Sequence, residues 1–150
     1  MIVQVTASRD WDDKQTVEAV LDFVWACCLA AAGGLGPETL TVRHGAARGG
    51  DTLAHLWAVR QRNDGLAVTP DPHPAQWNLY GQAAGRLRNT AMIELGNIDV
   101  CLAFSRSGSS GTADCAEKAR AARIPVWWQI YGQPLNPPPP ARLLGGVAWQ

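Results

Sequence analysis

The stretch "TLTVRHGAARGGDTLAHLWAVR" (39–60) contains a strand, a loop of small residues and a helix in direct succession. Residues 39–44 predict the strand, and Asp51 is placed to begin a helix that continues to about Arg62. A strand followed by a helix is the repeating unit of a parallel sheet, because the helix returns the chain to the start of the next strand. The residues at helical spacing are Leu53, Leu56, Trp57 and Arg60.

The same alternation runs along most of the chain and predicts an α/β fold. We expect a Rossmann-like three-layer sandwich, in which a five-stranded parallel sheet lies between two layers of helices. The other predicted strands are 1–6, 66–70, 98–104 and 124–130, and the other predicted helices are 14–32, 79–95 and 111–123.

Two details support helices on both faces of the sheet. Asp12 or Asp13 can cap the first helix, and Trp127 and Trp128 fall on opposite faces of the last strand. The expected buried face of the first helix consists of Val17, Val20, Leu21, Val24 and Cys28.

Length and composition indicate one globular domain with a short tail. The chain has 150 residues, of which 47% are hydrophobic and 17% charged. We assign residues 1–131 to the domain and 132–150 to a tail whose four consecutive prolines favour polyproline II. This tail is expected to dock on its own subunit or on a neighbour, as in a homodimer, through Leu143, Leu144, Val147 and Trp149.

The charge balance argues against a general nucleic-acid binder. Thirteen basic residues match thirteen acidic ones, whereas such binders normally have a basic excess. A local basic patch formed by Arg86, Arg88, Arg120 and Arg123 remains open.

The cysteines and apolar segments indicate a cytoplasmic protein without metal or other cofactor. The four cysteines have neither disulfide-framework nor metal-ligand spacing, so we expect reduced thiols. The first residues lack the features of a signal peptide, and the apolar run 20–34 contains Asp22 and is too short to span a membrane.

Three loops rich in small or polar residues follow predicted strands. They are "ASRD" (7–10), "GAARGGD" (45–51) and "SRSGSSGTAD" (105–114). In open parallel sheets, ligands bind beyond the carboxyl ends of strands, where the strand order reverses. Small residues let main-chain N–H groups approach an anion, and a helix beginning near Gly111 adds partial positive charge. We therefore predict a phosphate-bearing ligand, with hydroxyl donors from Ser107, Ser109, Ser110 and Thr112.

Common phosphate motifs do not fit. Gly45 and Gly50 have the P-loop interval, but Asp51 stands where that loop needs lysine, and no G-x-G-x-x-G follows the first strand. The structural alternative is two ordinary helix starts, with Asp51 and Thr112 as caps.

At these residues the chain resembles the YspA-type branch of the SLOG superfamily, over about residues 1–128. The shared segments are "VTASRDW", "HGAARGGDTLAHLWA", "PAQWNLYGQAAGRLRNTAMI", "DVCLAF" and "SGSSGTADCAEKARAARIPV", in this order. The resemblance implies strand order 3-2-1-4-5 and nucleotide-related ligands. The superfamily includes the LOG enzymes, which release a free base from nucleoside monophosphates, and the DNA-processing protein DprA.

The LOG enzymes carry a P-G-G-x-G-T-x-E loop and a preceding arginine. Gly108, Gly111 and Thr112 match that loop, Asp114 falls on its glutamate, and Arg88 is similar to the arginine. By resemblance, Arg88 and Asp114 are the candidate catalytic residues.

The match to these enzymes is incomplete. Ser107 and Ser109 replace proline and glycine, and Ala7 stands where the family usually has glycine. Asp114 is one methylene shorter than glutamate, and Glu117, one helical turn later, is a candidate substitute. These departures bear on hydrolysis more than on phosphate binding.

Each of the charged candidate residues has two possible roles, one in ligand binding and one in structure. Arg88 either clamps a phosphate or pairs with Asp114 or Glu94. Asp51 and Arg48 either contact ribose hydroxyls or pair with each other. The remaining expected ligand-binding residues are Ser8, Arg9, Gly45, Gly49, Gly50 and Asn89.

Aromatic residues are similarly ambiguous. Trp77, Tyr80 and Trp11 either stack on a base or pack against neighbouring elements, and packing is the more common role. His44 and His55 are expected to be structural.

Three functions remain open at this point. The first is binding of a nucleotide or nucleotide-derived ligand, to sense or sequester it. The second is LOG-like hydrolysis of the N-glycosidic bond of a nucleoside 5′-monophosphate. The third, a DprA-like DNA-binding role, ranks last because the chain is neutral.

Overall fold

Five parallel strands form the middle layer of the molecule. The computed structural model describes residues 1–31 and 38–135, and the sheet has the spatial order β3-β2-β1-β4-β5. Every pair of neighbouring strands is parallel. The predicted strand order is therefore confirmed. The strands are β1 (Ile2–Ala7), β2 (Leu40–His44), β3 (Val68–Pro72), β4 (Val100–Ser105) and β5 (Val126–Ile130).

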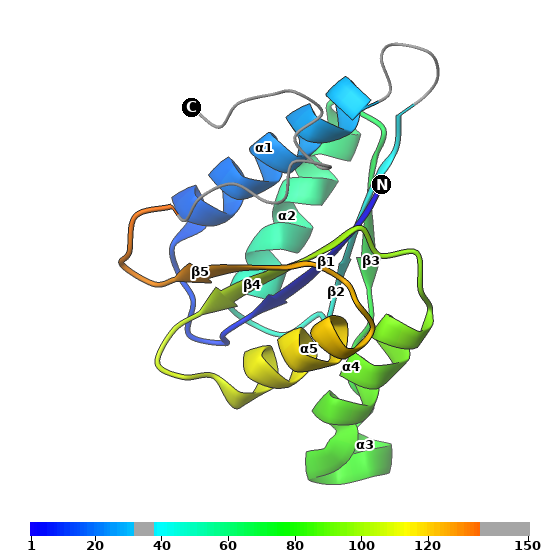
Figure 1. The fold of residues 1–150 in the computed structure, drawn as a ribbon, viewed down its shortest axis with the longest axis vertical. Helices are drawn as coiled ribbons and strands as arrows, with labels where there is room; N and C mark the ends of the chain where they lie inside the picture. Colours follow the sequence, from blue (N-terminus) through cyan, green and yellow to red (C-terminus); the bar gives the residue numbers. More distant parts are fainter. Residues whose placement is uncertain (32–37, 136–150) are drawn as a thin grey trace.

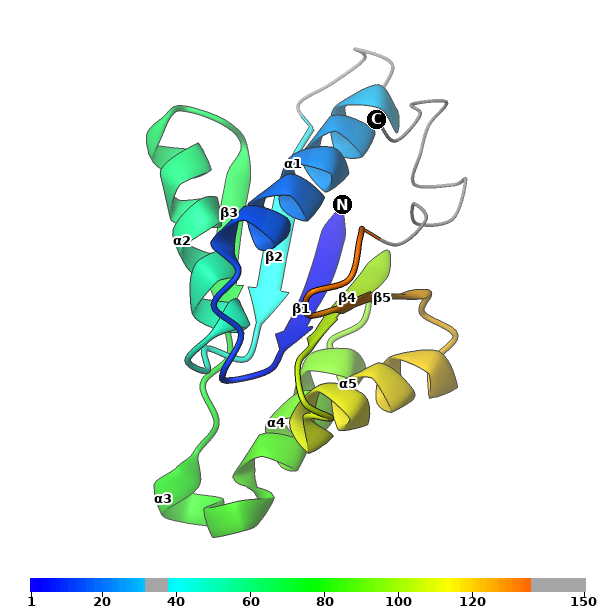
Figure 2. The same cartoon turned by 90° about the vertical axis from the view of Figure 1, so that its left-hand side faces the viewer.

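Helices cover both faces of the sheet, which confirms the predicted three-layer sandwich. Helices α1 (Lys14–Ala31) and α2 (Gly50–Asn63) lie on one face, and α4 (Ala84–Glu94) and α5 (Ser110–Ala121) lie on the other (Figures 1 and 2). Between β3 and α4 come the short helix α3 (Trp77–Tyr80) and the 3-10 turn η1 (Gly81–Ala83). Figure 2 shows α3 beyond the carboxyl ends of the strands.

The large apolar core lies between the sheet and the α1/α2 layer. Val3 and Val5 of β1 and Phe104 of β4 belong to it, together with the buried face of α1 that the sequence predicts. Residues that alternate with these point to the α4/α5 layer, where the Gln4 amide donates a hydrogen bond to the Met92 sulfur at 3.4 Å. Gln4, one of the largest fully buried side chains, thus lies on the α4/α5 side of the sheet.

Specific contacts also fix the start of α1 and the packing of α2 against it. Asp13 caps α1, because its Oδ1 accepts a hydrogen bond from the Thr16 N–H at 3.0 Å. In α2, Trp57 is fully buried and its indole N–H donates to Asp22 Oδ1 at 2.8 Å. Leu56, predicted on the same face, is instead 56% exposed, since the α2 contact face runs through Ala54, Trp57 and Ala58.

Two element boundaries differ from the prediction. Strand β3 occupies 68–72 rather than 66–70, and it includes Pro70 and Pro72. An edge strand accepts prolines because one of its sides needs no main-chain donors. The predicted helix 79–95 is broken near Gly81, whose φ of 54° lies in the left-handed region.

The predicted tail, residues 132–150, extends beyond the described residues. The proline-rich segment and its docking residues Leu143, Leu144, Val147 and Trp149 lie beyond the described residues. No helix in 1–31 or 38–135 is long and apolar enough to cross a membrane.

Candidate functional site

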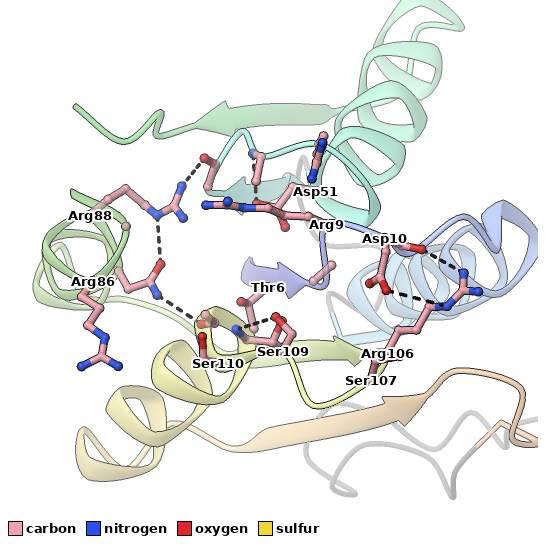
Figure 3. Close-up of a pocket in the computed structure, with 18 of the residues that line it drawn as sticks. Thr6, Arg9, Asp10, Asp51, Arg86, Arg88, Arg106, Ser107, Ser109 and Ser110 are labelled. Atoms are coloured by element: carbon pink, nitrogen blue, oxygen red, sulfur yellow. Dashed lines mark hydrogen bonds and ion pairs between the residues drawn. The ribbon is translucent and has the colours of Figure 1, made fainter. Parts of the chain in front are cut away.

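A pocket of about 480 Å³ opens at the carboxyl edge of the sheet, between β1 and β4 (Figure 3). This is where the chain order across the sheet reverses, the usual position of ligand sites in such folds. All three loops singled out in the sequence contribute to it. The predicted residues that line it are Arg9, Gly45, Arg48, Asp51, Arg88, Asn89, Ser107, Ser109, Ser110, Gly111 and Thr112.

The pocket concentrates positive charge in a chain that is neutral as a whole. Only Asp10 and Asp51 are acidic among its lining residues. In Figure 3, Arg9 and Arg88 extend into the same part of the pocket, and their charges repel each other. Such a concentration favours an anionic ligand. The lining arginines are Arg9, Arg48, Arg86, Arg88 and Arg106.

Arg88 is held in place by neutral acceptors. Its Nη1 donates to the main-chain carbonyls of Gly45 and, at 3.2 Å, of His73, while its Nε donates to Asn89 Oδ1 at 2.9 Å. Burial lowers the pKa of the Arg88 guanidinium from its ordinary value, and the nearby Asp51 opposes this shift. No carboxylate forms a salt bridge with Arg88 among the described residues, so its charge is available to a ligand.

Asp51 lies in the first turn of α2 and is 4% exposed. Its Oδ2 accepts a hydrogen bond from the Ala47 N–H at 3.4 Å, whereas its Oδ1 has no hydrogen-bond partner within the described part of the chain. Burial raises the pKa of Asp51 to about 6, although Arg88 acts in the opposite direction. Asp51 is not the helix cap, because that position is occupied by Gly49.

The glycines of the β2–α2 loop allow parts of the protein itself to approach closely. A Cβ added at Gly45 would lie 2.1 Å from Arg88 Nη1, and one added at Gly50 would lie 2.3 Å from the Ala7 Cβ. At Gly49 the added Cβ would lie 2.5 Å from the Ser8 carbonyl oxygen, and φ is 82°. These contacts explain why the loop lacks side chains whether or not a ligand also approaches it.

The loop after β4 directs the N terminus of α5 towards the pocket. Ser109 caps this helix, since its Oγ accepts hydrogen bonds from the Thr112 N–H at 3.4 Å and from the Thr112 hydroxyl at 3.1 Å. The predicted cap, Thr112, is therefore the donor in this pair. Ser107 has a φ of 52°, and Gly108 is exposed and lies outside the pocket lining.

The carboxylates that resemblance assigned to catalysis do not line the pocket. Asp114 Oδ2 accepts hydrogen bonds from Lys118 Nζ at 2.8 Å and from Asn89 Nδ2 at 3.0 Å. Glu117 is exposed and pairs with Arg120 at 2.9 Å. Asp114 thus contributes to the position of Asn89, and through it to that of Arg88.

Arg106 was not predicted as a site residue. Its N–H donates to Ser8 Oγ at 2.8 Å, and Ser8 Oγ donates back to the Arg106 carbonyl at 3.2 Å, so Ser8 is buried and joins the two loops. The Arg106 side chain donates to the Asp10 carbonyl at 2.9 Å and to Asp12 Oδ1 at 3.0 Å. The sequence does contain a signal for Arg106 as a site residue, because Arg106 directly follows β4 and so lies at the sheet edge where ligand binding is predicted.

The aromatic candidates separate into two groups. Trp77 lines the pocket, is 47% exposed, and has the Arg9 guanidinium 5.2 Å from its ring centroid. Trp11 is buried against Phe104, with ring centroids 5.3 Å apart, and Tyr80 lies outside this pocket. Of these three aromatic residues, Trp77 is therefore the one that lines the pocket.

The two histidines near the site hold the β2–α2 loop. His44 Nδ1 accepts a hydrogen bond from the Ala46 N–H at 3.1 Å, and His44 Nε2 lies 3.0 Å from His55 Nδ1. The Ala46 contact places the His44 proton on Nε2, so His44 donates to His55. Burial lowers the pKa of His44 to about 4, which keeps it neutral near pH 7.

Comparisons with known proteins give one family model and one similar phage protein. Residues 1–80 match the model of the family described as "YspA, cpYpsA-related SLOG family". The chain is 44% identical over 125 residues to "Gene 61 protein" of Mycobacterium phage D29, and the match covers 83% of this chain and 92% of that protein. No solved structure matches.

Proposed function

This chain belongs to the YspA, cpYpsA-related SLOG family, and on that premise we propose that it binds a nucleotide or nucleotide-derived ligand through its phosphate. The observation that carries the proposal is the gathering of five arginines around one pocket of a neutral chain. Arg106 pairs with Asp12, and the other four form no salt bridge among the described residues. Guanidinium groups suit phosphate because they donate paired, charge-assisted hydrogen bonds.

The phosphate is best accommodated between Arg88 and the N terminus of α5. Arg88 offers donors that no carboxylate neutralises among the described residues. The first turn of α5 contributes Ser110 and Gly111 to the pocket lining and adds the partial positive charge of a helix N terminus. Trp77, at the exposed rim, then offers a surface on which a base stacks.

Binding is favoured over hydrolysis of the N-glycosidic bond. General acid–base catalysis requires a titratable group within hydrogen-bond reach of the reacting atoms, and the resemblance gives this role to Asp114 and Glu117. Asp114 is held by Lys118 and Asn89, and Glu117 pairs with Arg120, so neither is directed at the pocket. The chain in this proposal senses or sequesters its ligand. Four free, buried cysteines are consistent with action in the reducing cytoplasm.

Incubation with a nucleotide panel tests this proposal. The panel comprises nucleoside monophosphates, NAD, ADP-ribose and cyclic dinucleotides, followed by ultrafiltration and chromatography of bound and free fractions. We expect at least one nucleotide to be retained intact. Release of free base by the wild type, and not by Asp114→Asn, would instead identify a hydrolase. No retention and no release would refute a nucleotide site.

A further inference from the structure

The pocket contains a buried acceptor that the phosphate does not use. Asp51 lines this cavity, and its buried Oδ1 lacks a hydrogen-bond partner among residues 1–31 and 38–135. A buried polar atom left unpaired is costly, by about 1–3 kcal/mol or more for a charged group. Because this unpaired oxygen belongs to a residue at the sheet edge where ligands bind, we expect its hydrogen-bond partner to be a group of the ligand.

The surroundings of Asp51 restrict the chemistry of that partner. A phosphate oxygen is unsuitable, because two anionic groups in a buried site repel each other. A metal ion is also disfavoured, since the Arg88 guanidinium is near enough to influence the Asp51 carboxyl, and no group of three metal-binding side chains occurs in the described residues. A neutral donor, such as a hydroxyl group, fits an isolated carboxylate oxygen beside an arginine.

The position of Asp51 relative to the phosphate site selects among neutral donors. Asp51 lies on the wall formed by the β2–α2 loop, whereas Ser109 and Ser110 lie on the facing wall (Figure 3). In a nucleotide, the group next to the phosphate is the ribose, with two adjacent hydroxyls. Trp77 lines the exposed rim of the pocket, so a base stacked on it would lie on the solvent side of the ribose.

We propose that Asp51 accepts a hydrogen bond from the 2′- or 3′-hydroxyl of a ribose, so that this pocket selects ribonucleotide-derived ligands over their deoxy counterparts. This inference rests on the proposed function, because the same pocket must bind the phosphate. A hydrogen bond to a charged acceptor changes affinity by about tenfold or more.

Matched nucleotide pairs measure this selectivity without knowledge of the base. Isothermal titration calorimetry would compare each of the four ribonucleoside 5′-monophosphates with its 2′-deoxy form, and AMP with 3′-deoxy-AMP. We expect removal of one hydroxyl to weaken binding at least tenfold. Ribonucleotides and both deoxy forms that bind within twofold of each other would overturn the inference and leave the proposed phosphate site intact. If none of them binds, this inference fails, whereas the proposed function is still decided by NAD, ADP-ribose and the cyclic dinucleotides of the panel.

Variants assign the selectivity to Asp51. Asp51→Ala should bring the ribo-to-deoxy affinity ratio close to one while deoxy binding persists. Asp64→Ala removes an exposed carboxylate from the other end of α2 and should leave the ratio unchanged. An unchanged ratio in Asp51→Ala would contradict the assignment.

A pH series provides a second readout in the wild type, which applies even if Asp51→Ala fails to fold. Because burial raises the pKa of Asp51 to about 6, the ratio should fall between pH 7.5 and pH 5 as the carboxylate becomes protonated. The phosphate also titrates near pH 6, but it does so in both members of a pair and cancels in the ratio. A ratio above one that does not change with pH would exclude Asp51 as the acceptor.

Discussion

Arg88 of α4 donates a hydrogen bond to the main-chain carbonyl of Gly45, the first residue after β2. The guanidinium occupies the space that a side chain at residue 45 would need, since an added Cβ would lie 2.1 Å from Arg88 Nη1. The glycine therefore fixes the position of the arginine. Strand β2 and helix α4, far apart in the sequence, are joined in this way at the pocket.

Gly45→Ala should displace Arg88 and weaken both the fold and ligand binding. We expect a loss of about 1–3 kcal/mol in the free energy of unfolding, because the displaced guanidinium loses its hydrogen bonds to partly buried main-chain carbonyls. Gly111→Ala is the matched control for stability, since an added Cβ there meets nothing within 4 Å, and it should leave stability unchanged or slightly raised. Urea denaturation measures both variants. Equal stabilities would refute the close-approach argument.

Arg88→Met should weaken binding of the retained nucleotide by about 10- to 100-fold. The reason is the loss of charge-assisted hydrogen bonds to phosphate, each contributing about 1.5–3 kcal/mol. Arg62→Met removes an exposed arginine at the other end of α2 and should bind like the wild type. Calorimetric titration of the two variants decides the matter. Similar affinities of the two variants would show that Arg88 does not contact the ligand.

Asp51→Asn should make the protein more stable at neutral pH. In the wild type the folded-state pKa of Asp51, about 6, lies above the ordinary value of 3.8, so folding favours the protonated form. The stabilisation is complete below pH 3.8 and is lost as pH rises through about 6. Above that pH the ionised carboxyl costs about 3 kcal/mol at most.

The pH dependence of this difference is the test. Thermal or urea unfolding of both proteins from pH 4 to pH 8 should show that the advantage of Asp51→Asn grows with pH and levels off above about pH 7. A variant that is less stable than the wild type at pH 7.5 would mean that the ionised Asp51 carboxylate stabilises the fold. Asp51 would then not be a charge that is kept for ligand binding at a cost in folding stability.

Ser8→Ala should loosen the loop after β4. Ser8 Oγ is the acceptor for the Arg106 N–H at 2.8 Å, and its removal leaves that donor without its partner. A loss of about 1–2 kcal/mol is expected, together with faster hydrogen exchange at the Arg106 amide. Ser110→Ala, at an exposed position of the same loop region, should change neither quantity appreciably. Unaltered exchange at Arg106 in Ser8→Ala would contradict this role.

The order of strands and the meeting of three loops could be predicted because they depend on local patterns and on resemblance. Apolar runs such as 98–104 define strands by composition, and parallel topology brings their carboxyl ends to one edge. The shift of β3 to 68–72 could not be read from composition, because Pro70 and Pro72 are tolerated only at a sheet edge.

Side-chain roles within the site depend on neighbours far along the chain. The sequence allowed Asp51 to be a cap, a partner of Arg48 or a ligand contact; the structure places Gly49 at the cap position and buries Asp51 near Arg88, and the ligand contact stays a proposal. Asp114 matched a catalytic motif by position, yet Lys118, one helical turn later, and Asn89 of another helix engage its carboxylate. Spacing alone could not predict either outcome.

Amide chemical-shift mapping would test nucleotide binding at the arginine-lined pocket most directly. A ¹⁵N-labelled sample would be titrated with the four ribonucleoside 5′-monophosphates and with ADP-ribose. We expect saturable shifts that cluster around the arginine-lined pocket, at the amides of Arg9, Gly45–Arg48, Arg88–Asn89 and Arg106–Thr112. Saturable shifts confined to another surface, or none with any of these ligands, would contradict the proposed site.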